Sequence, residues 1–354
     1  MFAGVYRAAT GREAVPNDFF ISLLGVGGWG LAAFSLVLTG CGRYRDFKLP
    51  EQAGGPSVTW RWQARPDPVM TRGAPGEWDA LDVLNPSVIR QGDAYYNLFS
   101  GYDGKTWHTG LAVSGDGVTW REEGKILSPD PGTWEGSAIA ANGSAVADES
   151  GILYYYQAGD NTVQIGLARS RNGHQWVKNG APVLAAGPWE SWDERGVADP
   201  YVILAGRGYY MFYLGMDRAR RQRLGVAESQ DGVRWYKLRG NPILELGEYG
   251  AFDEVGLGEP AVWASRGYYW MLYTGRDRHE VRRLGLGRSR DGVRWEKLPP
   301  AIAGQQAWDS KVICDPTVIA NGDRVTVWFG GGDIARPDQN IHGQIGFGQL
   351  LATE

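Results

Sequence analysis

Short segments of alternating apolar and polar residues recur along most of the chain, separated by glycine, asparagine and aspartate. Segments such as "DPYVILA" at 199–205 precede segments rich in tyrosine and tryptophan, such as "YYMFYLG" at 209–215. A segment of the type "LGVAES" comes next, and a "DG" pair then leads to a tryptophan. Short segments of this kind, bounded by turn residues, predict β-strands joined by tight turns.

The same order of segments recurs five times. Four repeats end in the motifs "SGDGVTW", "SRNGHQW", "SQDGVRW" and "SRDGVRW", whose tryptophans are 56, 59 and 60 residues apart. Four short strands per repeat at this period are typical of propeller blades. The sequence therefore predicts an all-β fold, a five-bladed β-propeller with four antiparallel strands per blade. The expected blades cover about residues 77–127, 128–184, 185–244, 245–300 and 301–350.

The fifth repeat lacks its fourth strand, because it stops after "IGFGQL" at 345–350. The missing piece occurs near the other end, where "VTWR" at 58–61 matches "VTWR" at 118–121. We therefore expect residues 57–76 to supply the outer strand of the last blade and a linker. Closure of the ring in this way removes the sheet edges that an open ring would expose.

Composition narrows the classes of function. The formal net charge of the 354 residues is only -4, so a nucleic-acid partner is not expected. With 52 glycines and 16 tryptophans, the chain suits many tight turns and leaves aromatic surface for ligands. Its two cysteines, Cys41 and Cys314, exclude a disulfide framework. We expect a monomer.

The first 41 residues differ from the rest. Residues 19–40 form an uncharged apolar run that ends in "LTGC" at 38–41. This segment resembles the signal peptide and lipobox of bacterial lipoproteins, which implies lipidation of Cys41. The alternative is a transmembrane anchor, because the run is long enough to cross a bilayer. Residues 42–56 would then be a linker, and either alternative places residues 57–354 outside the cytoplasm, attached to the membrane.

Polar residues head the first strand of every repeat, and proline follows four of them. They are Asn85, Asn142, Asp199, Glu259 and Asp315. Proline is tolerated at the start of an innermost strand, where a backbone N–H has no ladder partner. Three acids around one narrow axis repel each other and lose hydration, so stability alone does not explain them. We therefore predict a site at the axis, with Asn85 and Asn142 as substrate-binding groups.

Two further sets of residues are expected on the same face as this site. One set follows each second strand and includes Asp217 and Asp277, which are candidates for turn capping or for ligand contact. The other is an aromatic-acidic pair before each first strand, in which Trp192 and Trp308 either pack between blades or stack on a sugar. Arg218 and Arg278 lie beside the second set and either bind substrate or balance the acids.

Five repeats with a Trp-Asp pair, an Asp-Pro step, an aromatic second strand and an Asp-Gly turn resemble the five-bladed propellers of the arabinanase, levansucrase and invertase superfamily. Glycoside hydrolase families 43, 32, 68 and 130 belong to it, and the resemblance extends from about residue 57 to 350. In families 43 and 32, acids that head successive inner strands act in catalysis, the last being a glutamate general acid. Asp199, Glu259 and Asp315 are the residues here that can correspond to those acids. Because Asp199 and Asp315 flank Glu259 on the ring, their charges are expected to raise the pKa of Glu259. We therefore predict Glu259 as acid, Asp199 as base or nucleophile, and Asp315 as the group that orients them and modulates their pKa values.

The first repeats depart from that pattern, because asparagine stands where those families have a catalytic aspartate and cannot act as a base. Asp79 and Asp82, just upstream of Asn85, are alternative acids. The resemblance also implies an optional structural cation, such as calcium, in the central channel near His342, and no required cofactor. We predict an extracytoplasmic glycosidase acting on an oligo- or polysaccharide by carboxylate acid/base chemistry. The alternatives are a non-catalytic carbohydrate-binding propeller and a structural or protein-binding one.

Overall fold

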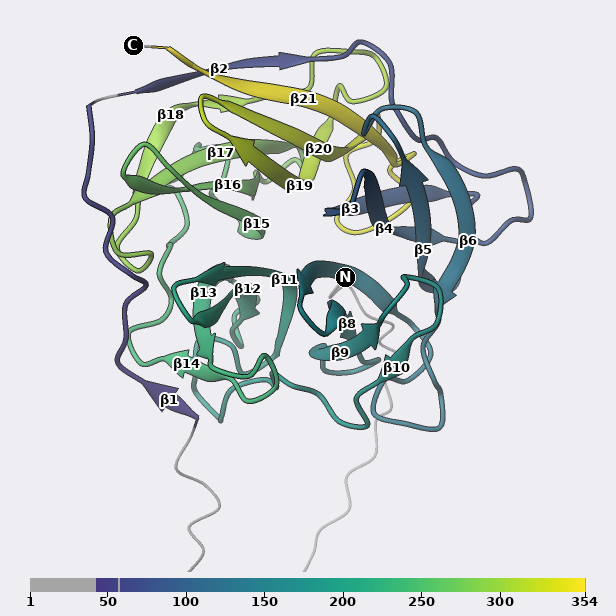
Figure 1. The fold of residues 1–354 in the computed structure, drawn as a ribbon, viewed down its shortest axis with the longest axis horizontal. Coiled ribbons are helices and arrows are strands. Elements are labelled where there is room, and N and C mark those ends of the chain that lie inside the picture. The colour runs from purple at the N-terminus through teal and green to yellow at the C-terminus, as the bar shows by residue number, and fades with distance from the viewer. Residues whose placement is uncertain (1–42, 57, 354) are drawn as a thin grey trace, which may run out of the picture.

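The computed structural model describes residues 43–56 and 58–353, and in that part of the chain all regular structure is β-strand. None of the described elements is a helix that could cross a membrane. The signal or anchor segment and Cys41, predicted from residues 1–41, lie outside the described residues. Figure 1 shows the strands gathered in groups around a common centre.

The strands pair as antiparallel groups of four, in chain order from the centre outward. The first group is β3 (Asp82–Gln91), β4 (Ala94–Tyr102), β5 (Trp107–Ser114) and β6 (Arg121–Leu127). The second is β7 (Ala140–Asp148), β8 (Gly151–Ala158), β9 (Gln164–Ser170) and β10 (Val177–Lys178). The third is β11 (Gly196–Ala205), β12 (Gly208–Met216), β13 (Gln222–Ser229) and β14 (Tyr236–Leu238). The fourth is β15 (Gly256–Ser265), β16 (Tyr268–Arg276), β17 (Arg282–Ser289) and β18 (Glu296–Ile302).

The last group combines three strands from the C-terminal end of the described chain with one strand from near its N-terminal end. Its strands are β19 (Val312–Asn321), β20 (Arg324–Gly332), β21 (Gln344–Thr353) and β2 (Thr59–Ala64). β2 pairs antiparallel with β21 over its whole length, as the "VTWR" match predicts. Trp60 of β2 packs edge-on against Trp263 and Trp270 of the fourth group, with ring centroids 6.0 and 5.5 Å apart. The N-terminal strand therefore takes the place of the missing fourth strand.

Neighbouring groups are linked at one end of the strands by a single parallel pair of residues. These pairs are Trp107 with Ile139, Val163 with Gly196, Gln222 with Gly256, and Arg282 with Val312. Between the last and first groups, the Val83 N–H donates to the Gly343 carbonyl at 3.0 Å. The β12–β13 and β16–β17 loops lie at this same end, which we call the mouth face.

The Asp-Gly turns lie at the opposite end and hold each group against the preceding one. In the fourth group, the Asp291 side chain accepts hydrogen bonds from the N–H groups of Val293 and Arg294. Trp295, which follows this turn, packs edge-on against Phe212 of the third group at 5.9 Å. The same contact links the first and last groups, because Trp120 packs against Trp328. The turn motifs are thus structural, as the sequence indicates.

Residues 43–56 form a strap along the outside of the third and fourth groups, seen at the left of Figure 1. β1 (Tyr44–Arg45) pairs in parallel with β14. The strap then crosses the turn side of the fourth group, where the Leu49 N–H donates to the Asp291 carbonyl at 3.0 Å. Lys48 lies 3.5 Å from the Asp291 carboxylate. The strap therefore runs on the side of the molecule opposite to the mouth face.

Asp291→Ala is expected to lower the free energy of unfolding by about 1 kcal/mol, because two part-buried N–H groups lose their acceptor. Burial raises the pKa of Asp291, but hydrogen bonds from Arg294 and Val293 lower it to about 2. The folded-state pKa is thus below the unfolded value, so the stabilisation is complete above about pH 4 and is lost as the pH falls towards 2. Urea unfolding between pH 2 and 7, with exposed Asp67→Ala as control, measures this. An equal effect of both substitutions would contradict the role of the turn.

Candidate functional site

The five residues that head the inner strands share one unusual backbone conformation. We call them the head residues: Asn85, Asn142, Asp199, Glu259 and Asp315. Each has a positive φ, between 47° and 51°. Each also lies in a β-bulge, where two residues of the inner strand face one residue of the second strand. Asparagine and aspartate tolerate this left-handed region better than glutamate does, so Glu259 is held there at a cost in strain.

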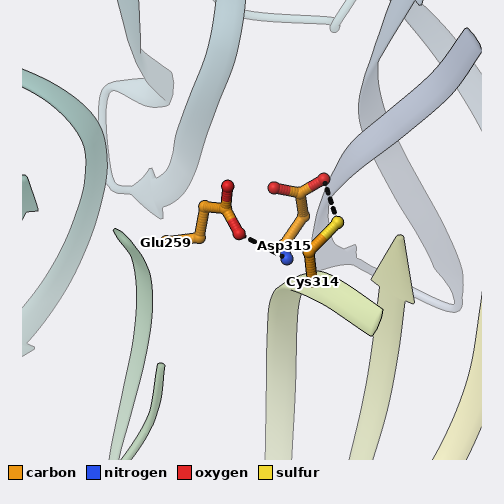
Figure 2. Close-up of side chains that lie close together, drawn as sticks. All are labelled: Glu259, Cys314 and Asp315. Carbon is orange, nitrogen blue, oxygen red and sulfur yellow. Dashed lines mark hydrogen bonds between the residues drawn. The ribbon is translucent and has the colours of Figure 1, made fainter. Parts of the chain in front are cut away.

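The bulges leave backbone N–H groups that face the axis and need acceptors. The Asp315 N–H donates to Glu259 Oε2 at 3.0 Å, and the Asn85 N–H donates to Asp315 Oδ2 at 3.3 Å. The carboxylate of one head residue thus accepts from the next head residue around the axis. Figure 2 shows Glu259 extended from β15 towards the backbone of Asp315.

The N–H groups of Asn142 and Asp199 follow the two asparagine head residues around the axis, and they find different acceptors. The Asn142 N–H donates to Ser100 Oγ at 2.9 Å, and the Asp199 N–H donates to Gln157 Oε1 at 3.1 Å. Ser100 and Gln157 occupy equivalent places on the second strands β4 and β8. A polar residue of the second strand therefore accepts the hydrogen bond that a head carboxylate accepts elsewhere, so the fold does not require acids at positions 85 and 142.

The head residues separate two cavities along the axis, and together we call these the central channel. The cavity towards the mouth face is lined by all five head residues and by a polar set that includes Gln157, Gln222, Arg276, Arg282 and Asp338. The cavity towards the turn side is lined by the head residues, by the four prolines that follow them and by Tyr201. Asp199, Glu259 and Asp315 therefore all face the same space, as the sequence predicts.

The electrostatics of the three acids are uneven. Burial raises the pKa of Asp199 to about 7, and the charge of Glu259 contributes in the same direction. Burial and Glu259 also raise the pKa of Asp315 well above its usual value. Arg282, which is only 7% exposed, lies close enough to lower both pKa values slightly. At neutral pH the channel therefore holds carboxyl groups that retain protons, and general acid catalysis requires such a group.

A cation site at the axis is poorly supported by the donors present. Side-chain donor atoms of Glu259, Cys314 and Asp315 lie within 4.8 Å of one another. The Cys314 thiol donates to Asp315 Oδ2 at 3.1 Å, and burial raises the pKa of the thiol well above its usual value. Calcium requires six to eight oxygen ligands, so a protonated thiol and two carboxylates do not fit it. His342 lies instead on the mouth face, where Nδ1 is 2.8 Å from Asp333.

The aromatic-acidic pairs belong to the packing of each group. The rings of Trp192 and Trp308 lie against Tyr213 and Phe329, with centroids 5.5 and 5.9 Å apart. A Cβ on Gly215 would lie 2.3 Å from the Trp192 ring, so the glycine leaves room for it. The acid of the pair is buried, as Asp193 is beside Lys237 at 2.5 Å. Neither Trp192 nor Trp308 lines the central channel.

The other predicted binding residues are engaged locally. Asp217 accepts from the Arg221 N–H and pairs with the Arg223 guanidinium, and Asp277 accepts from two N–H groups of its own turn. Arg218 and Arg278 pair with glutamates on the mouth face. Of the two alternative acids, Asp82 is fully buried and accepts from three N–H groups of residues 340–343. Neither Asp82 nor Asp79 lines the channel.

Sequence reasoning missed the polar residues on the second and third strands that line the channel. Gln157 interrupts the apolar run "LYYYQAG" at 153–159, and Thr274 interrupts "YYWMLYTG" at 268–275. Both of these polar residues line the channel, so this interruption was the available signal. Arg276 ends β16 and Arg282 begins β17, and Arg276 lies only two residues before the predicted loop residue Arg278.

Comparisons with known proteins support the fold. Residues 93–255 match the glycosyl hydrolases family 32 N-terminal domain. An uncharacterized protein of Mycobacterium tuberculosis is 26% identical over 231 residues, covering 60% of this chain and 75% of that protein. A family 117 glycoside hydrolase from Zobellia galactanivorans superposes with a TM-score of 0.62 at 15% identity, covering 83% of this chain and 90% of that chain. A thermostable family-43 glycoside hydrolase gives 0.58 at 16% identity, covering 76% and 88%.

The chain has the fold of the β-propeller glycosidases. Their fold was the one expected from the repeat, and the similarity to the solved structures spans most of the described strands.

Asp199→Asn is expected to stabilise the protein at pH 8 by on the order of 2 kcal/mol, because wild type must bury a charge there. The folded-state pKa of Asp199, about 7, lies above the ordinary value of 3.8. Wild-type stability therefore falls as the pH rises from about 4 to 7, and the advantage of the variant disappears near pH 4.

Thermal unfolding of both proteins at pH 4, 6 and 8 measures this difference. Asp93→Asn, on an exposed turn, is the control. A gain that is independent of pH would contradict a raised pKa at Asp199.

Proposed function

We propose that the protein is a glycoside hydrolase that cleaves glycosidic bonds in the central channel with Asp199 and Glu259. The observation that carries the proposal is the convergence of Asp199, Glu259 and Asp315 on one cavity, where the pKa of Asp199 is raised to about 7. Glycosidases need one protonated carboxyl and one carboxylate on either side of the bond. Asp199 supplies the protonated carboxyl, and Glu259 is the acid beside it that we assign to the second role.

The electrostatics favour a particular division of roles. A carboxyl group with a pKa near 7 retains its proton at working pH, so Asp199 is the better general acid. Glu259 then acts as base or nucleophile, the reverse of the roles predicted from the sequence. Asp315 accepts from the Asn85 N–H and from Cys314, and these hydrogen bonds orient its carboxyl group beside Glu259.

The proposal includes a closed ring of five blades. It is supported by the repeated parallel contacts between groups, by the Val83 to Gly343 hydrogen bond and by the pairing of β2 with β21. A closed ring keeps the head residues around one axis, so acids from three blades can act on one substrate.

A non-catalytic carbohydrate-binding role is the second candidate. The observation that favours it is the presence of Asn85 and Asn142 at two of the five head positions, where neither side chain can serve as acid or base. In this case the same cavity would hold a sugar without turnover.

Glu259→Gln and Asp199→Asn are each expected to lower kcat for aryl glycosides by at least about 100-fold. A panel of nitrophenyl furanosides and pyranosides identifies a substrate, and dinitrophenyl analogues of it then separate the two roles. A leaving group that needs no proton rescues the variant that lacks the acid, so the deficit of Asp199→Asn shrinks and that of Glu259→Gln does not.

Exposed Asp67→Asn is the matched control for both variants and should match wild type. Rescue of Glu259→Gln instead would assign the acid to Glu259. Wild-type rates in Glu259→Gln would end the hydrolase proposal, and sugar binding without turnover would support the second candidate.

We also propose that the protein is held outside the cytoplasm by a lipid on Cys41, on the basis of the "LTGC" motif at 38–41. Bacteria that express the full chain and are fed an alkyne fatty acid should label wild type but not Cys41→Ala, and only wild type should stay with the membrane fraction. Membrane retention of unlabelled Cys41→Ala would favour the transmembrane anchor instead. Cys314→Ala is the matched control, because this buried thiol carries no lipid signal.

A further inference from the structure

Two aromatic rings on the mouth face are largely exposed to water. Trp189 is 76% exposed and Tyr249 is 88% exposed. They occupy equivalent places three residues before Trp192 and Phe252, in the linkers that lead into β11 and β15. Exposed rings of this size carry a cost in water, so their retention needs a reason beyond folding.

Each ring is held in place by the same arrangement of charged groups. The Arg218 guanidinium lies 3.6 Å from the centre of the Trp189 ring, and that of Arg278 lies 3.8 Å from Tyr249. Glu194 accepts two hydrogen bonds from Arg218, at 2.9 and 3.2 Å, and Glu254 pairs with Arg278 in the same way. Each glutamate also accepts an N–H from the residue that follows the exposed ring. The rings are thus ordered before any ligand binds, which lowers the entropic cost of binding.

The arrangement is confined to the third and fourth groups. At the places of the two rings, the other groups have Pro75, Pro131 and Gln305. At the places of the two glutamates they have Ala80, Gly136 and Ser310, and at the places of the two arginines they have Gly104, Asn161 and Ile334. Three of the five groups therefore fold without it. A role in packing does not explain why two neighbouring groups carry all three residues.

The loops that hold the two rings join strands that line the central channel. Arg276 lines the channel and lies two residues before Arg278, while Gly256 lines it and lies two residues after Glu254. On the third group, Gln222 lines the channel, and its neighbour Arg223 lines a surface cavity that also contains Arg218 and Glu194. A chain that leaves the channel over these groups passes the exposed rings.

We propose that Trp189 and Tyr249 form an outer binding platform for a neutral glycan chain that extends from the central channel. The apolar face of a sugar ring stacks on an aromatic ring, and the paired charges of Arg218 with Glu194 and Arg278 with Glu254 leave no net charge to select an acidic polymer. The platform therefore selects a polysaccharide over a disaccharide. This inference rests on the proposed function only for the statement that the glycan extends from the central channel, because binding at the platform does not need catalysis.

The test is native gel electrophoresis of the Glu259→Gln protein in gels that contain soluble arabinan, mannan, xylan or levan. We expect retardation in at least one neutral polysaccharide, and a loss of apparent affinity of about 10-fold or more for Trp189→Ala/Tyr249→Ala. Trp189→Phe/Tyr249→Phe keeps the rings and should retain most of the affinity, and Leu204→Ala, an exposed apolar residue elsewhere, should match the parent. Unchanged thermal midpoints show that the variants are folded.

The platform is overturned if no neutral polysaccharide retards the protein, if the double alanine variant binds like its parent, or if Leu204→Ala loses as much affinity. It is also overturned if polygalacturonate alone is bound, or if the rings instead mediate binding to phosphatidylglycerol vesicles. Failure of the proposed hydrolysis is distinguishable, because it appears as absent turnover in the wild type while binding in these gels remains sensitive to the two rings.

Discussion

The constraint on which the site depends is a backbone one. Five inner strands bulge at the same place with a positive φ, and the bulges turn N–H groups towards the axis that no ladder partner can satisfy. Side-chain acceptors must therefore be present around the axis. Glu259 and Asp315 supply two of them, and Ser100 and Gln157 supply others. The carboxylates are thus held in place by the same hydrogen bonds that make the bulges possible.

The fold requires a hydrogen-bond acceptor for each of these N–H groups, but it does not require that the acceptor be an acid. A second-strand hydroxyl or amide satisfies an N–H as well as a carboxylate does, as at Ser100 and Gln157. Acids are therefore retained only where something else favours them, and they are clustered on three consecutive groups. Burying them together raises the pKa values of Asp199 and Asp315, which costs stability near neutral pH. Such a cost is characteristic of functional sites.

Much of this could be predicted from the sequence, because the repeat fixes which residues are equivalent. The head residues, the Asp-Gly turns and the pairing of β2 with the last repeat follow from aligning the repeats. The repeat does not show what a ring packs against. Trp192 and Trp308 are seated over glycines of the adjacent strands, and that depends on two positions distant in sequence. Arg276 and Arg282 were missed because a shift of two residues at a strand end decides whether a side chain faces the channel or the rim. Which carboxyl group keeps its proton depends on burial, which no spacing reveals.

The burial of the linker rings also explains why the residue three positions before each ring differs among the groups. In the third group, for example, the linker is fixed by Trp192 over Gly215 and by the buried Asp193 beside Lys237. Once these two side chains are buried, the residue three positions earlier contributes little to packing, and it is Pro75, Trp189 or Tyr249 in different groups. Packing within the repeat therefore does not explain an exposed ring at that position. Among the described groups, the exposed rings occur on the two that carry Asp199 and Glu259. One extended ligand that contacts both the acids and the rings explains this coincidence most simply.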